Sequence, residues 1–209
     1  MKKKLSWITG TLYLTVLLHF LAANCISSRA GNFPTEPLTQ PKPLPQKISI
    51  DFETTVNADF AADRNIAKAW LDVAEKELAD RFTDVLKQSQ NFDRIAPGTG
   101  KENYHVKLTK DMITSNGGWA TLTLIVSGLG LVLPRFAGTT ESNFTFEVSK
   151  KDKPIKTYSY TGAKMHDFGW TLFAFVMPFT STKKVYNEME IFTMKKFLID
   201  AEADQIFSK

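Results

Sequence analysis

A cluster of five prolines most constrains how this chain can fold, because it separates two parts of the sequence that differ in kind. The cluster lies within residues 31–46 and comprises Pro34, Pro37, Pro41, Pro43 and Pro45. Proline fixes φ and has no backbone N–H, so a helix or an internal strand cannot run through such a segment. With few apolar neighbours, the segment predicts an extended polyproline-like spacer, about 50 Å long at ~3.1 Å per residue.

The part before the spacer has the pattern of a secretory signal. Lys2, Lys3 and Lys4 form a positive start, an apolar run follows from Leu5 to Ala23, and residues 1–24 contain no acidic side chain. A basic start followed by a short apolar run and small residues is typical of a signal peptide. We expect residues 1–24 to be removed; a retained anchor helix is the alternative.

The only cysteine of the chain, Cys25, follows this segment directly. Its setting resembles a bacterial lipobox, and the looser form resembles those of spirochaetes. Leu21 lies four residues before the cysteine instead of the usual three, and Asn24 stands where that motif usually has Gly, Ala or Ser. The resemblance implies that Cys25 is acylated, as by palmitate, and begins the mature chain. Ile26 is no inner-membrane retention signal, which favours the outer membrane; ordinary cleavage after Ala30 is the alternative.

The charge of the mature chain limits its partners. The whole chain of 209 residues has a formal net charge of +4, but three of its lysines belong to the predicted signal. The remaining acidic and basic residues nearly balance. A near-neutral chain lacks the basic surface typical of nucleic-acid binding, so we expect no nucleic-acid partner.

Residues 47–209 predict a single α+β domain that follows a tether over residues 25–46. Apolar and polar residues alternate in strands, while helices show apolar residues at three- to four-residue spacing. We expect a small sheet of about four or more strands covered by two amphipathic helices. The expected strands are 48–53, 104–108, 144–148 and 155–160, and the expected helices end near 89 and span about 184–206, with a connection over 91–100 and a polar hairpin loop over 150–154.

Two uncharged apolar segments, 119–133 and 168–179, are inserted in this domain. Both are shorter than the roughly twenty residues that a transmembrane helix needs. They fit buried core strands or, alternatively, short helices that touch lipid or a partner, and we expect them to lie next to each other. The residues expected at a membrane or partner contact are Trp119, Leu122, Leu124, Leu129, Leu131, Trp170, Phe173 and Phe175.

No constellation for catalysis, cofactor or metal binding is found. The loop at 96–101 departs from the phosphate-binding pattern at Ile95 and Glu102. His105 is expected to face outward, and Asp51 and Glu53 to share one solvated strand face. Two histidines without clustered carboxylates do not predict a metal site, which needs three or four converging ligands. We therefore expect a protein that is not an enzyme and has no cofactor.

The strand at 47–52, the helix and segment up to Ile95, and the strand at 103–108 are together similar to small periplasmic α/β lipoprotein domains. These include the curli-secretion, penicillin-binding-protein-activator and TolB N-terminal types. The similarity covers about half of the chain and rests on pattern, so no binding residue can be carried over. It implies a membrane-anchored, non-enzymatic scaffold or accessory component of the bacterial envelope with a protein partner. The alternative is a carrier or sensor of apolar ligands.

Overall fold

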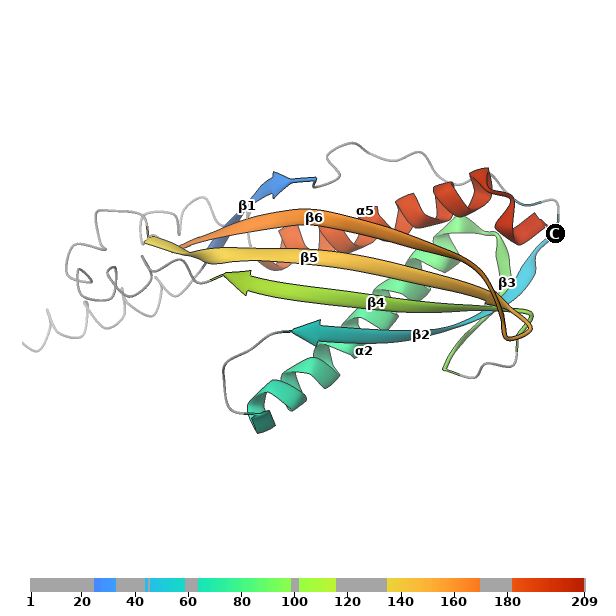
Figure 1. Cartoon of the computed structure of the whole chain (residues 1–209), viewed down its shortest axis with the longest axis horizontal. Helices are drawn as coiled ribbons and strands as arrows, with labels where there is room; N and C mark the ends of the chain where they lie inside the picture. Colours follow the sequence, from blue (N-terminus) through green and yellow to red (C-terminus); the bar gives the residue numbers. More distant parts are fainter. Residues whose placement is uncertain are drawn as a thin grey trace, which may run out of the picture. The chain divides into compact units, whose positions relative to one another are not determined.

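The computed structural model describes residues 25–32, 44, 46–58, 64–98, 102–115, 135–169 and 182–208. Its strands are β1 Cys25–Gly31, β2 Ile48–Ala58, β3 Phe92–Pro97, β4 Tyr104–Ser115, β5 Arg135–Lys150 and β6 Lys153–Gly169; its helices are α2 Arg64–Ser89, α5 Thr182–Ala203 and the short 3₁₀ helix η2 Ile206–Ser208. These described strands form one sheet in the order β1-β6-β5-β4-β2-β3 (Figure 1). The expected α+β class, a small sheet with two helices, is confirmed.

The chain divides into two compact units. The first contains residues 1–29, 115–140 and 165–185, and the second contains residues 30–114, 141–164 and 186–209. The second unit holds β2, α2 and β3 entirely, together with most of β4 and α5. The described part of the first unit consists of strand ends and the first residues of α5.

Strand β2 pairs in parallel with both β3 and β4. Its first half, Ile48–Phe52, pairs with β3, and Ile50–Ala58 pairs with β4. A parallel strand must be reached by a crossover, and α2 provides it between β2 and β3. The expectation that 91–100 is only a connection is wrong, since Phe92–Pro97 forms β3. This strand is short, and its two adjacent exposed residues, Asp93 and Arg94, interrupt the alternation of apolar and polar residues by which strands were predicted.

Strands β4, β5 and β6 run antiparallel in sequence order. Lys150 of β5 donates to the hydroxyl of Tyr104 at 3.0 Å, while Phe144 lies near Lys110, so β4 and β5 run in opposite directions. The turn between β5 and β6 contains Lys151 and Asp152 at φ of 50° and 62°. Two positive φ values in a two-residue turn match the twist of a hairpin, as expected for the predicted polar loop.

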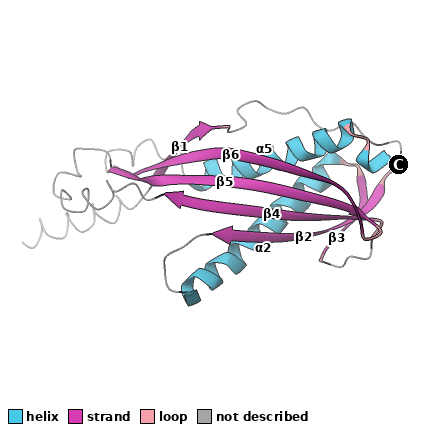
Figure 2. Ribbon diagram, viewed as in Figure 1, coloured by secondary structure: helices cyan, strands magenta, loops and turns pink. Residues whose placement is uncertain are grey.

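Both helices of the second unit lie on the same face of its strands, as Figure 2 shows. Three fully buried phenylalanines hold these layers together, namely Phe82 of α2, Phe146 of β5 and Phe197 of α5. Phe146 and Phe197 stack in parallel with ring centroids 4.3 Å apart, and Phe82 lies 6.0 Å from Phe146 and 6.3 Å from Phe197. Phe52 of β2 completes the cluster with an edge contact to Phe82 at 5.1 Å.

The helical spacing of its apolar residues predicts that Val73, Leu78, Phe82 and Val85 of α2 are buried. Leu78, Phe82 and Val85 are buried, but Val73 is 58% exposed. At 3.6 residues per turn, a position five residues before Leu78 lies about 140° around the helix from it. Leu71 and Ala74, at seven and four residues before Leu78, follow the stripe instead and are half-buried.

We predict that Phe197→Ala lowers the free energy of unfolding by about 3–5 kcal/mol, the usual cost of truncating a buried phenylalanine. The cost arises because Phe197 contacts both Phe82 and Phe146, and their rings would border a cavity. Val73→Ala is the control, since an exposed side chain should change stability by less than about 0.5 kcal/mol. Urea denaturation measures both, and equal effects would contradict the proposed role of the cluster.

Candidate functional site

The predicted site residues are only partly within the described chain. Cys25 is described as the first residue of β1. The eight apolar residues expected to contact a membrane or partner, in 119–131 and 170–175, lie outside the described residues, as does the predicted signal at 1–24. Of the segment 168–179, only Phe168 and Gly169 are described, and both belong to β6. The expected proximity of the two apolar segments therefore stays a prediction.

The start of the predicted tether lies on the edge of the sheet. Residues Cys25–Gly31 form β1, which is the neighbour of β6 in the sheet order. Just beyond the strand, the backbone N–H of Asn32 donates to the carbonyl oxygen of Gly162 at 2.9 Å. The side chain of Asn32 donates to the carbonyl oxygen of Thr161 at 3.3 Å. A free spacer was expected from residue 25 onward, but residues 25–32 lie against β6.

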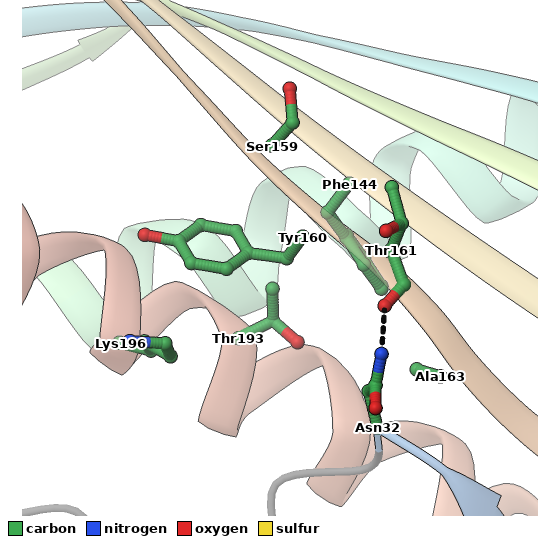
Figure 3. Close-up of a pocket in the computed structure, with 8 residues that line it drawn as sticks. All are labelled: Asn32, Phe144, Ser159, Tyr160, Thr161, Ala163, Thr193 and Lys196. Atoms are coloured by element: carbon green, nitrogen blue, oxygen red, sulfur yellow. Dashed lines mark hydrogen bonds between the residues drawn. The ribbon is translucent and has the colours of Figure 1, made fainter.

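Asn32 also forms one wall of a pocket between β6 and α5 in the second unit (Figure 3). The pocket has a volume of about 300 Å³. Its lining combines aromatic rings with hydroxyl, amide and ammonium groups: Asn32, Phe144, Ser159, Tyr160, Thr161, Ala163, Thr193 and Lys196. Such a mixture suits a small ligand with both apolar and polar parts. No sequence pattern predicted it, because its residues come from four separate segments.

Polar groups that line or adjoin this pocket are paired with one another. The Tyr160 hydroxyl donates to Asp200 at 2.7 Å, and Lys196 donates to the same carboxylate at 3.0 Å. Tyr158 donates to Asp204 at 2.7 Å, and Lys156 donates to it at 2.6 Å. Each carboxylate thus joins a tyrosine and a lysine at the β6–α5 boundary.

These contacts change the acidity of the tyrosines and of one carboxylate. Burial, and then the hydrogen bond to Asp200, raise the pKa of Tyr160 well above its usual value. Burial and the bond to Asp204 do the same for the pKa of Tyr158. The hydrogen bonds from Lys156 and then Tyr158 lower the pKa of Asp204. Both phenols therefore keep their protons, and remain hydrogen-bond donors, to a higher pH than an ordinary tyrosine does.

A buried ionic cluster joins α2, β4 and α5. Glu190 of α5 is 3% exposed and Lys110 of β4 is 4% exposed. Their charged atoms lie 2.6 Å apart, and Arg81 of α2 approaches the other Glu190 oxygen at 2.5 Å. Arg81 also donates to Asn187 at 2.6 Å. Burial of charge requires such pairing. The pairing could not be predicted from local sequence patterns because Glu190 and Lys110 are 80 positions apart.

The outer face of the sheet carries cross-strand polar pairs. Asp51 is fully buried, its Oδ1 lies 2.5 Å from His105 Nδ1, and its Oδ2 accepts the backbone N–H of Glu102 at 3.0 Å. Glu53 and Lys107 form the next pair at 3.5 Å. The expectation that Asp51 is solvated is wrong, since β2 and β4 place it directly opposite His105. The alternation of residues correctly assigned Asp51 and Glu53 to one face of β2, but it could not show which residues of β4 lie opposite them.

The described residues contain no group of three or more histidine, cysteine, aspartate or glutamate side chains that could hold a metal ion. No helix among the described residues is long and apolar enough to cross a membrane.

Comparison with protein-family models and with curated proteins finds no match. Among solved structures, the chain is similar to a protein described as a neuraminyllactose-binding hemagglutinin homolog from Helicobacter pylori, with 6% identity, a TM-score of 0.44, and coverage of 85% of this chain and 98% of that one. It is also similar to a PelC dodecamer subunit from Paraburkholderia phytofirmans, with 9% identity, a TM-score of 0.33 and coverage of 81% and 96%. A DUF330 protein from Xanthomonas campestris has 9% identity, a TM-score of 0.36 and coverage of 82% and 93%. Likenesses this distant assign neither a family nor a function.

We predict that stability falls as the pH rises above about 10, the ordinary tyrosine pKa. The folded-state pKa values of Tyr158 and Tyr160 are raised, so the unfolded chain loses these protons first and unfolding becomes easier. The stabilisation is complete below pH 10 and is lost progressively above it. Tyr160→Phe should make this alkaline loss less steep. Urea denaturation between pH 8 and 11 measures it, with Tyr186→Phe, outside this cluster, as control.

Proposed function

We propose that this protein is an exported bacterial envelope protein, held to a membrane by lipid on Cys25, and that it works through protein contacts without catalysis. The observation that carries the proposal is the position of the single cysteine, directly after a segment with the pattern of a signal peptide. One lipid chain binds a membrane only marginally, whereas several chains anchor a protein firmly. The outer membrane is the favoured location, because Ile26 is no retention signal.

The strand ends that flank the two apolar segments lie at one end of the sheet. Strand β4 ends at Ser115 and its antiparallel neighbour β5 begins at Arg135, so residues 116–134 leave and re-enter the sheet at one end. Thr139 of β5 lies 2.9 Å from His166 of β6, close to where β6 ends at Gly169. We propose that this end of the sheet, with residues 119–133 and 170–179 beyond it, faces the membrane or an envelope partner.

These flanking residues and the start of β1 belong to one compact unit. The unit contains Cys25–Arg29 together with residues 115–140 and 165–185. A lipid on Cys25 would therefore belong to the same compact unit as the strand ends that flank the apolar segments. This arrangement supports a protein that binds its partner at a membrane surface.

The two buried carboxylates, Asp51 and Glu190, favour a non-enzymatic role because they hold secondary-structure elements together. Asp51 binds His105 and the backbone of Glu102, and Glu190 binds Lys110 and Arg81. A catalytic acid or base must instead reach a proton of the substrate. Protein contacts at the membrane are the function that this arrangement supports best.

We predict that Cys25→Ala abolishes incorporation of labelled palmitate and moves the protein from the detergent phase to the aqueous phase on phase separation. The reason is that the acyl chains supply the membrane affinity, at ~0.8 kcal/mol per buried CH₂. Ser28→Ala is the matched control and should behave as the unaltered protein does. A Cys25→Ala protein that keeps its processing and still partitions into detergent would contradict the anchor.

Crosslinking in intact cells followed by pull-down tests the second half of the proposal. We expect a defined envelope protein to be crosslinked, and native mass spectrometry after mild detergent extraction to show it bound. A stoichiometric lipid without any protein partner would instead support a carrier of apolar ligands.

A further inference from the structure

We infer that Gly31 and Gly162 lock the N-terminal arm, residues 25–32, onto the edge of the sheet, so that the lipid on Cys25 holds the domain close against a lipid surface. This inference rests on the proposed lipid anchor. The domain would then lie next to the membrane, and not at the end of the long spacer that was expected over residues 25–46.

Two glycines make the close crossing of the arm and β6 possible. Gly31 has φ of +64° and Gly162 has φ of +81°, in the left-handed region that other residues rarely adopt. A Cβ atom on Gly31 would lie 2.3 Å from the carbonyl oxygen of Gly162, which is a backbone atom that cannot move aside. Only glycine at position 31 therefore permits this approach.

The bond network around Gly162 shows that the crossing is built into the sheet. The N–H of Gly162 donates to the side chain of Asn143 on β5 at 3.1 Å. Its carbonyl oxygen accepts the N–H of Asn32 at 2.9 Å. A glycine with positive φ inside a strand is typical of a bulge, and this one presents its oxygen to the arm while β5 holds its nitrogen.

The other end of the proline-rich segment is also fastened. The N–H of Leu44 donates to the side chain of Asn91 at 2.8 Å, and the N–H of Ile48 donates to the carbonyl oxygen of Asn91 at 3.2 Å. The segment from 33 to 43 thus connects two points that are both fixed to the second unit. Its length cannot add to the distance between the lipid and the domain.

Only the length of β1 then separates the lipid on Cys25 from the point at which the arm is fixed to β6. Cys25 and Gly31 are six positions apart along the chain, which corresponds to about 20 Å at ~3.3 Å per residue of strand. A free tether over residues 25–46 would instead extend to about 65 Å at ~3.1 Å per residue. The two arrangements therefore differ about threefold in the distance at which the domain can stand from the membrane.

The test uses Gly31→Ala, with Gly98→Ala as a matched control. Gly98 also has a positive φ, +73°, but a Cβ atom there would have no neighbour within 4 Å. Both variants carry backbone strain, and only Gly31→Ala forces the arm from β6. Hydrogen exchange of a peptide covering 25–32, in full-length Cys25→Ser protein, measures the lock without any lipid. We expect Gly31→Ala to speed this exchange at least about tenfold, and Gly98→Ala to leave it unchanged.

The distance to the membrane is measured on the lipid-modified protein in vesicles of phosphatidylethanolamine and phosphatidylglycerol. A dye on Lys76→Cys, an exposed position of α2, transfers energy to an acceptor in the lipid head groups. We expect transfer to be lower in the Gly31→Ala variant than in the unaltered protein, and to be unchanged in the Gly98→Ala variant. Unchanged exchange in Gly31→Ala would overturn the lock. A lock confirmed by exchange, in a protein that acquires no lipid, would overturn the anchor and with it the membrane contact.

Discussion

The contact between Phe146 and Phe197 is the one on which the rest of the second unit depends. Their rings stack at 4.3 Å between the sheet and α5, and Phe82 brings α2 to the same point. Three elements far apart in sequence thus share one buried cluster. Because each large apolar side chain contributes about 1.5–3 kcal/mol when buried, this cluster supplies much of the energy that fixes both helices on one face.

The ionic cluster of Lys110, Glu190 and Arg81 also joins the sheet to α2 and α5, by a different physical interaction. Apolar packing tolerates small shifts, whereas separating a buried carboxylate from its partners destabilises the fold by several kcal/mol. The charged cluster therefore restricts how α2 and α5 can slide against β4.

The periodicity of apolar residues predicted those features of the fold that depend on the sequence of a single strand, helix or turn. The buried positions of β2, the hairpin at 150–154 and the apolar stripe from Leu78 to Val85 all follow from alternation or helical spacing. The prediction was wrong where the answer depends on a neighbour. Strand β3 is recognisable only through its pairing with β2, and Asp51 is buried only because His105 lies opposite. Likewise, the pocket at Asn32 depends on the crossing at Gly162, which no local pattern reveals.

The pairing of β1 with β6 also sets the order in which the chain must fold. Asn32 and Thr161, which are hydrogen-bonded, lie 129 positions apart, so closing this contact costs about 1 kcal/mol more chain entropy than pairing β2 with β3, where Ile48 pairs with Phe92. A chain crossing a membrane from its N-terminus presents the arm first, long before β6 has been delivered. The first strand to be delivered is therefore among the last to be paired. Until it pairs, the backbone groups along the edge of β6 have no strand partner there. In an exported and lipid-anchored chain, as we propose, the anchored end would thus be in place while the sheet that holds it is still incomplete.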